Sequence, residues 1–346
     1  MVKFAGTAGA ALDAALDRSV VLGYTKVGSR IRKLWWPADP PPRAMAGKRV
    51  VVTGATAGIG AAMAEPFSRL GATVHLVGRD EAKVRRRAGE IRGTVSGAQV
   101  VEEVCDVSDL DAVRAWTGDL TNRIDALHGL VHNAGVMPKQ RAETKQGNEI
   151  QFATHVLGPH LMTENLLTLL NAAGEAAVVF MSSGGMYSAP LKRWGTSELE
   201  STDGDYNGVR VYARTKRMQV VLAEAWARRL ATSPVRVYST HPGWVETPGV
   251  ADALPGFRRL TRPLLRDAAD GADTAVWLVA TRPESHGENF WHDRAQRPTT
   301  FGWQRDEDAQ LIASFVNEVS DITNTARNWS DYLVDTADLI SRVDDE

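Results

Sequence analysis

Two ionisable side chains stand one helical turn apart in the segment VYARTK, residues 211–216. Tyr212 and Lys216 are four residues apart, so both would leave the same face of a helix. A free phenol has a pKa of about 10 and is a poor base at neutral pH, but a nearby ammonium favours the phenolate. Tyr212 could then exchange a proton with a substrate oxygen. Taken alone, the pair is better explained as two neighbouring side chains on an ordinary helix surface than as a catalytic pair. The catalytic interpretation therefore depends on other features of the sequence.

A glycine-rich segment supplies the second chemical feature. VVVTGATAGIGAAMAE places Gly54, Gly58 and Gly60 between an apolar run and a helical stretch. Glycines let the backbone turn sharply and approach a pyrophosphate, and the following helix offers unpaired N–H groups and its positive dipole end. A glycine-rich turn without a ligand could have the same spacing. The strand before it and the helix after it favour a nucleotide site.

The elements that must position these residues alternate along the chain. Apolar, β-branched runs predict strands at 48–54, 72–78, 98–106, 126–135, 176–183, 235–243 and 288–293. Helices are predicted to end at Leu70 and to cover 81–92, 109–122, 148–172, 209–231 and 268–280. This alternation predicts an α/β fold, a Rossmann-like doubly wound parallel sheet in a single domain with N- and C-terminal helical extensions. Ligands of such sheets bind beyond the carboxyl ends of the strands.

Composition narrows the class of protein. The 346 residues are 43% hydrophobic and 24% charged, which fits one large domain with appendages, and the net charge of −2 argues against nucleic acid as a partner. The single cysteine, Cys105, cannot form an internal disulfide and favours a reducing, cytoplasmic compartment. No run of about twenty apolar residues predicts a membrane span. The histidines have no metal-ligand spacing, so we predict no metal site.

A proline-rich stretch, PADPPPR at 37–43, marks a linker. We therefore divide the chain into an N-terminal helical extension with its linker (1–45), a catalytic domain (46–300) and a C-terminal helical tail (301–346). Residues 8–36 mix basic side chains with Val, Leu, Ile, Tyr and Trp. Such a helix could lie on a membrane surface, cover the substrate mouth or pack on a partner, although packing on its own domain is the commoner outcome. We expect the core to fold without it.

Five motifs in order resemble the short-chain dehydrogenase/reductase family over about 47–295. They are TGATAGIG, CDVSD, HNAG, FMSSGG with YARTK, and HPGWVETP. The resemblance implies an enzyme that transfers a hydride between NAD(P) and an alcohol/carbonyl pair, and it implies a homo-oligomer. The cofactor residues that it implies are Gly54, Thr56, Gly58, Ile59, Gly60, Arg79, Asp106, Val107, Asn133, Ala134, Gly135, Tyr212, Lys216, Pro242, Gly243, Val245 and Thr247.

The resemblance also assigns catalytic roles. Tyr212 would be the acid/base, Lys216 would assist it and hold the cofactor ribose, and Ser183, rather than Ser182, would hydrogen-bond the substrate oxygen. In FATHVLG, His155 stands where the family often has an Asn that holds a water on the proton path. His155 could relay protons near neutral pH. The interpretation of His155 as a tolerated replacement, without a role on the proton path, is slightly favoured.

The second predicted strand ends in LVGRD, where NAD-preferring members usually carry an acid. Gly78 stands at that end and Arg79 follows, and a guanidinium suits a 2′-phosphate. NADP (as NADPH) is therefore favoured, with NAD still possible. Arg79 could instead be a solvated charge.

Mostly apolar residues after the strands are expected to bind a small-molecule alcohol, aldehyde or ketone of lipophilic character. They are Met186, Tyr187, Trp194, Trp244 and the segment 245–265. Two other functions remain open. A dinucleotide-binding module that has lost catalysis would fit the replacement at His155, and a sugar-nucleotide epimerase or dehydratase would also use YxxxK.

Overall fold

One sheet organises the molecule. The computed structural model describes residues 7–191, 199–202, 204–247, 255–285, 289–301, 307–325, 328–330 and 332–333. Within them, an eight-stranded sheet has the order β3-β2-β1-β4-β5-β6-β7-β8 and is parallel except for the β7–β8 pair. The strands are β1 Arg49–Thr53, β2 Thr73–Gly78, β3 Gln99–Val104, β4 Gly129–His132, β5 Ala176–Met181, β6 Val235–Thr240, β7 Phe290–His292 and β8 Ala295–Gln296. The predicted doubly wound α/β fold is confirmed.

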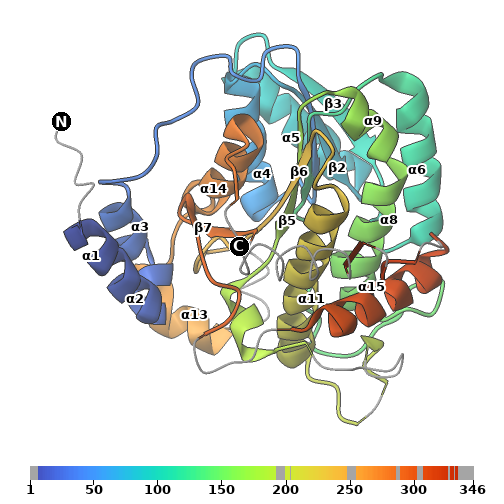
Figure 1. The fold of residues 1–346 in the computed structure, drawn as a ribbon. Helices are drawn as coiled ribbons and strands as arrows, with labels where there is room; N and C mark the ends of the chain where they lie inside the picture. The colour runs from blue at the N-terminus through green and yellow to red at the C-terminus, as the bar shows by residue number, and fades with distance from the viewer. Residues whose placement is uncertain are drawn as a thin grey trace, which may run out of the picture.

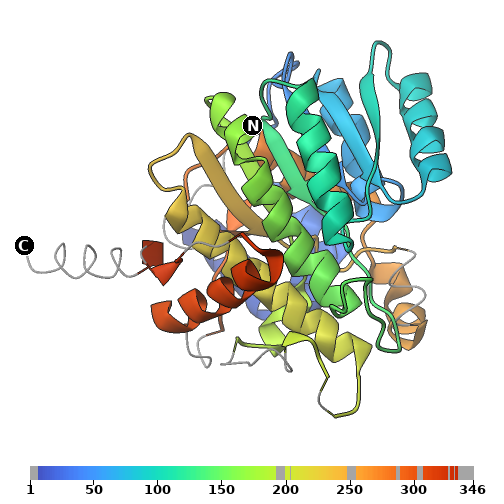
Figure 2. The same ribbon diagram turned by 90° about the vertical axis from the view of Figure 1, so that its right-hand side faces the viewer.

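Helices cover both faces of the sheet (Figures 1 and 2). The α-helices are α1 Thr7–Arg18, α2 Val20–Tyr24, α3 Lys26–Arg32, α4 Gly58–Arg69, α5 Glu81–Thr94, α6 Leu110–Arg123, α7 Ile150–Phe152, α8 Gly158–Asn165, α9 Leu167–Ala172, α11 Gly208–Arg229, α13 Pro255–Thr261, α14 Ala268–Thr281 and α15 Ala309–Thr323. Three shorter turns are the π-helical η1 Ala153–Leu157 and the 3₁₀ turns η2 Gly184–Ser188 and η3 Arg262–Leu264.

The alternation of side chains along each strand explains the two layers. In β1, Val50 and Val52 pack into the core beneath α4, α5 and α14, whereas Val51 packs into the core beneath α6, α8 and α11. Strands buried on both faces need nearly continuous apolar runs, which is the pattern that the sequence has.

The region 148–172, which was predicted as one long helix, is not a single regular α-helix. The region 148–172 contains a π-helical turn, η1, between α7 and α8. Gly158 follows it, and a Cβ there would lie 2.1 Å from the carbonyl oxygen of Val107. The close approach of this helix to the end of β3 is a tertiary contact that periodicity does not reveal. π-Helical turns inside α-helices occur frequently at functional sites.

The first and the last helices that the structure describes pack on the central domain. Helices α1–α3 lie beside β7 and α13 at one edge of the molecule (Figure 1). Helix α15 packs against α8 and α11. Among the residues that the structure describes, no helix combines the length and apolar character needed to cross a membrane.

Candidate active site

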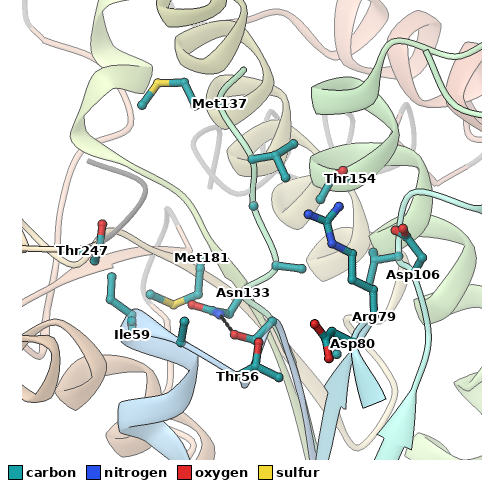
Figure 3. Close-up of a pocket in the computed structure, with 18 of the residues that line it drawn as sticks. Thr56, Ile59, Arg79, Asp80, Asp106, Asn133, Met137, Thr154, Met181 and Thr247 are labelled. Atoms are coloured by element: carbon teal, nitrogen blue, oxygen red, sulfur yellow. Dashed lines mark hydrogen bonds between the residues drawn. The ribbon is translucent and has the colours of Figure 1, made fainter. Parts of the chain in front are cut away.

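A cavity of about 440 Å³ lies at the carboxyl ends of the strands. Its wall draws on the ends of β1 to β6, as expected for a doubly wound sheet. Figure 3 shows Arg79 and Asp106 on one side of the cavity, with Ile59 and Thr247 on the other. The predicted cofactor residues that line it are Gly54, Thr56, Gly58, Ile59, Arg79, Asp106, Val107, Asn133, Ala134, Gly135, Tyr212, Lys216, Pro242 and Thr247.

The glycine loop after β1 is built by close backbone packing. Gly54 has φ +65°, and a Cβ there would lie 2.8 Å from the Cα of Ala134. A Cβ at Gly60 would lie 2.3 Å from Nδ2 of Asn133. Asn133 Nδ2 donates to the carbonyl oxygen of Thr53 at 2.9 Å, which fixes the HNAG segment against the loop. Helix α4 begins at Gly58, so its free N–H groups face the cavity as an anion site.

The end of β2 carries two cations toward the cavity. Arg79 is exposed and lines it, as does Lys83, which the sequence analysis missed. Asp80 caps α5 by accepting from the backbone N–H of Lys83 at 3.0 Å, so this carboxylate already has a structural partner. A Cβ at Gly78 would lie 2.7 Å from Cγ2 of Thr56 and 2.8 Å from Cγ2 of Val84. An acidic side chain therefore has no room at the strand end without repacking.

Asp106 follows β3 on the same side of the cavity (Figure 3). Its Oδ1 accepts from the backbone N–H of Ser108 at 3.0 Å and from the Ser108 hydroxyl at 2.7 Å. These bonds orient the carboxylate. A glycine cradle at a helix N-terminus, a carboxylate and two nearby cations together fit a dinucleotide.

Tyr212 and Lys216 both reach the cavity from α11. Lys216 is 3% exposed, and its Nζ donates to the carbonyl oxygen of Met181 at 2.8 Å and to Oε1 of Gln219 at 2.9 Å. The same Nζ lies 5.4 Å from the centroid of the Tyr212 ring. Burial lowers the pKa of Lys216 to about 7. Burial also raises the pKa of Tyr212 to about 12, and a hydrogen bond from Ser183 opposes that rise.

The two serines after β5 have different surroundings. The Ser182 hydroxyl donates to the carbonyl oxygen of Lys216 at 2.8 Å and so ties β5 to α11. Ser183 caps the η2 turn, with its hydroxyl accepting weakly from the backbone N–H of Gly185 at 3.3 Å. Of the two, Ser183 is the one that faces Tyr212.

His155 is fully buried in the π-helical turn. Its Nε2 accepts from the backbone N–H of Val136 at 3.0 Å, so this nitrogen carries no proton. Its Nδ1 lies 2.8 Å from the Thr215 hydroxyl, and its ring lies edge-on to that of Tyr212 at 5.5 Å. Burial keeps the pKa of His155 well below 6.5, and the charge of Lys216 acts in the same direction. The imidazole is therefore neutral and bridges the loop after β4 to α11.

Several predicted residues lie outside the cavity wall as the described residues define it. They are Gly60, His155, Ser183, Gly243 and Val245. Lining residues that the sequence analysis did not select are Ala57, Gly78, Asp80, Lys83, Cys105, Val136, Met137, Thr154, Met181 and Ser182. Lys83 could have been found, because it lies one turn into the helix that follows LVGRD.

The predicted substrate residues are only partly described. Met186 and Tyr187 are buried in an aromatic cluster with Tyr24 and Phe290, against which Trp244 packs. Trp194 lies outside the described residues, as does the stretch 248–254 of the segment 245–265.

Comparison with known proteins gave consistent matches. The family model described as Enoyl-(Acyl carrier protein) reductase matches residues 54–281. Human dehydrogenase/reductase SDR family member 12 is 37% identical over 251 residues, 72% of this chain and 77% of that protein. Human retinol dehydrogenase 14 is 30% identical over 302 residues, 80% of this chain and 87% of that protein. A Beutenbergia cavernae structure, provisionally assigned as an NAD(P)-dependent gluconate 5-dehydrogenase with NADP at low occupancy, aligns with a TM-score of 0.56 and 26% identity over 68% of this chain and 91% of that chain.

Proposed function

The chain belongs to the short-chain dehydrogenase/reductase family, and we propose that it is an NADP-preferring oxidoreductase acting on a lipophilic alcohol/carbonyl pair. The observation that carries this proposal is that Tyr212 and Lys216 line the same cavity as the glycine loop and Arg79, while Ser183 hydrogen-bonds to Tyr212. The alternatives of an impaired regulatory module and of a sugar-nucleotide epimerase lack a comparable observation.

In the proposed mechanism, a bound nicotinamide dinucleotide supplies or accepts the hydride. Tyr212 carries its proton at neutral pH, because burial raises the pKa of the phenol to about 12. It is therefore suited to donate that proton to a carbonyl oxygen, and Ser183 orients the same oxygen. As the proton leaves, the Lys216 ammonium stabilises the phenolate. His155 holds the neighbouring loop and Tyr212 in place and does not carry the proton itself.

The preference for NADP rests on the end of β2. Arg79 is exposed at the cavity and can bind a 2′-phosphate, and Lys83, which pairs with Asp80 at 3.4 Å, stands one turn away. The crowding around Gly78 leaves no room for an acid that would bind ribose hydroxyls. NAD remains the second candidate.

The substrate class rests on apolar lining and on relatives. Met137 and Met181 line the cavity (Figure 3), and the carbonyl oxygen of Met181 accepts from Lys216 Nζ. Human retinol dehydrogenase 14, by its name, acts on retinol, a lipophilic alcohol. We extend that chemical class, and not retinol itself, to this chain.

The cellular setting is also a proposal. Leu12 in α1, Leu22 in α2 and Leu34 just after α3 are 46%, 50% and 78% exposed, and Arg30 and Lys33 are also exposed. Exposed leucines beside basic residues support peripheral membrane contact by a cytoplasmic protein. Homo-oligomerisation is proposed from family membership. Vesicle co-sedimentation tests the membrane contact, and analytical ultracentrifugation tests the homo-oligomer.

The central experiment is a panel of carbonyl compounds with the wild type and Tyr212→Phe. We expect the wild type to oxidise NADPH with a lipophilic aldehyde or ketone. Tyr212→Phe keeps the ring and NADPH binding, but turnover should fall by about two to four orders of magnitude, the usual contribution of a positioned acid/base. Equal turnover of wild type and Tyr212→Phe on an identified substrate would contradict the assignment.

A further inference from the structure

The ring of Tyr24, from the N-terminal helices, lies directly on the catalytic turn after β5. A Cβ at Gly184 would lie 2.5 Å from Cε2, 3.1 Å from Cδ2 and 3.3 Å from Cζ of Tyr24, and these are its three nearest atoms. Gly184 follows Ser183, so the ring backs the turn that presents the Ser183 hydroxyl. Tyr24 is 3% exposed, and its ring also meets those of His241 and His292 at 4.5 and 5.5 Å.

The backbone of the same segment holds the loop after β6. The carbonyl oxygen of Tyr24 accepts from the backbone N–H of Trp244 at 2.7 Å and from Nε of Arg266 at 3.0 Å. Gly243 has φ +77°, and a Cβ there would lie 2.7 Å from the same carbonyl oxygen. This loop begins with Pro242, which lines the cofactor cavity. The N-terminal segment therefore contacts two of the segments that build the active site.

Buried charges fix the segment in place. Arg32, at the end of α3, donates to the carbonyl oxygen of Gly23 at 3.2 Å and pairs with Asp293 at 3.0 Å. Arg266 donates to the same carbonyl oxygen at 2.9 Å and binds Asp293 through a second nitrogen. The three charged side chains are each 1–2% exposed. Removing one partner of such a network leaves an uncompensated buried charge, which is strongly unfavourable.

The turn between β7 and β8 contacts the N-terminal segment through residues with unusual backbone angles. Asp293 and Arg294 have φ values of 51° and 56°, a conformation that usually selects Asn or Gly. Both residues nevertheless contact the N-terminal segment. Asp293 binds Arg32, while Arg294 lies 4.8 Å from the centroid of Trp36 and donates to the carbonyl oxygen of Pro37 at 3.1 Å. The hairpin thus binds both the extension and its linker.

We propose that Tyr24 is a positioning residue of the active site, which holds the Ser183–Gly184 turn, and that the N-terminal helices complete the site. The proposal rests on the oxidoreductase function proposed above. It places an element that precedes the linker among the determinants of turnover. Tyr24 acts through Ser183, and Ser183 acts on the substrate oxygen and on Tyr212.

The test is a double-mutant cycle in the full chain. Gly184→Ala places a methyl group against the Tyr24 ring, so we expect kcat to fall about tenfold through displacement of Ser183. Tyr24→Ala should also lower kcat about tenfold while the Kd for NADPH changes less than about threefold. In the Tyr24→Ala protein the added methyl group has room, so Gly184→Ala should there cost less than about twofold.

Two further measurements separate positioning from loss of folding. Tyr24→Phe keeps the ring that contacts Gly184, His241 and His292, so this variant should keep wild-type kcat and thermal stability. In Tyr24→Ala, loss of the Ser183 hydrogen bond should move the rising limb of alcohol oxidation, on which Tyr212 loses its proton, to higher pH. A general packing defect would lower the melting temperature and leave that limb unchanged.

Additive losses in an active wild type, with the pH limb unmoved, would overturn the role of Tyr24 and leave the proposed function intact. A wild type without turnover on any carbonyl would overturn the proposed function and, with it, the role of Tyr24 in turnover. A loss of kcat on Gly184→Ala that is about tenfold in the wild type but less than about twofold in Tyr24→Ala would support both.

Discussion

Burial shifts the pKa values of Tyr212 and Lys216 in opposite directions. Burial disfavours both the phenolate and the ammonium, so the pKa of Tyr212 rises to about 12 and that of Lys216 falls to about 7. Near neutral pH, the phenol is almost fully protonated, whereas the amine is divided between its two forms. The pair is therefore better prepared to donate a proton to a carbonyl than to remove one from an alcohol.

This balance predicts how carbonyl reduction depends on pH. The ammonium that stabilises the developing phenolate is present below the Lys216 pKa of about 7 and is lost as the pH rises through it. We expect kcat/KM for NADPH, which reports the free enzyme, to fall across that range. His155→Asn is the control, because His155 is neutral throughout and the limb should stay in place. Loss of the limb in His155→Asn would make that imidazole the titrating group.

Arg79 allows a second test at the level of single residues. Its guanidinium has a free approach to the cavity, and a hydrogen bond between charged groups is worth about 1.5–3 kcal/mol. Arg79→Ala should therefore weaken NADPH binding by roughly ten- to a hundredfold and leave NADH binding unchanged. Arg86→Ala removes an exposed guanidinium from the same helix region and serves as the control. Equal affinity of the wild type for the two cofactors, unchanged in Arg79→Ala, would contradict the preference.

At the scale of elements, a carboxyl pair fastens the segment 199–202 to the start of α7. The backbone N–H of Glu149 donates to the Glu200 carboxylate, and the Glu149 side chain accepts from Phe152 N–H at 2.8 Å and from the Tyr206 hydroxyl at 2.9 Å. Burial raises the pKa of Glu200 to about 7, and the negative charge of Glu149 acts in the same direction. The folded protein therefore holds a proton on Glu200 that the unfolded chain releases.

The corresponding prediction concerns thermal stability. Because the folded-state pKa lies above the unfolded value of 4.5, this contribution is complete below 4.5 and is lost as the pH rises through about 7. The wild type should lose more melting temperature between pH 5 and pH 8 than Glu200→Gln, which can still accept the bond but cannot titrate. Glu143→Gln, at a half-exposed acid nearby, should behave like the wild type. Parallel curves for wild type and Glu200→Gln would refute the assignment.

At the scale of the whole molecule, the N-terminal helices belong to the packing of the central domain. Arg32 is 1% exposed and pairs with Asp293 beneath β7, and Asp13 and Asp17 complete its ion pairs at 2.8 and 3.0 Å. Removing residues 1–36 would leave Asp293 and Arg266 facing a void. We expect the shortened protein to melt at a lower temperature and to bind NADPH less tightly.

The control for this deletion is Leu34→Ser in the full chain, since Leu34 is 78% exposed and should tolerate the change. A shortened protein with the wild-type melting temperature and NADPH affinity would show that the helices are an independent appendage, as the linker composition alone suggested.

The sequence by itself determined the alternating elements, the glycine cradle and the Tyr212–Lys216 pair, because each is a local pattern. Strand and helix periodicities arise from neighbours in the chain, and a glycine loop works through its own backbone. Ser183 and Arg79 could be placed at strand ends for the same reason. Lys83 also lay within reach of this reasoning.

Only the tertiary structure decided the features that require contact between distant parts of the chain. The pKa directions at Tyr212 and Lys216 are set by burial, which no local pattern specifies, and burial lowers the Lys216 pKa to about 7. The two hydrogen bonds of His155 join the loop after β4 to α11. The contact of Tyr24 with Gly184 spans 160 residues of sequence, and the buried pair of Arg32 with Asp293 spans 261. Such contacts form because the sheet brings strand ends together, and the spacing of residues along a chain carries no record of them.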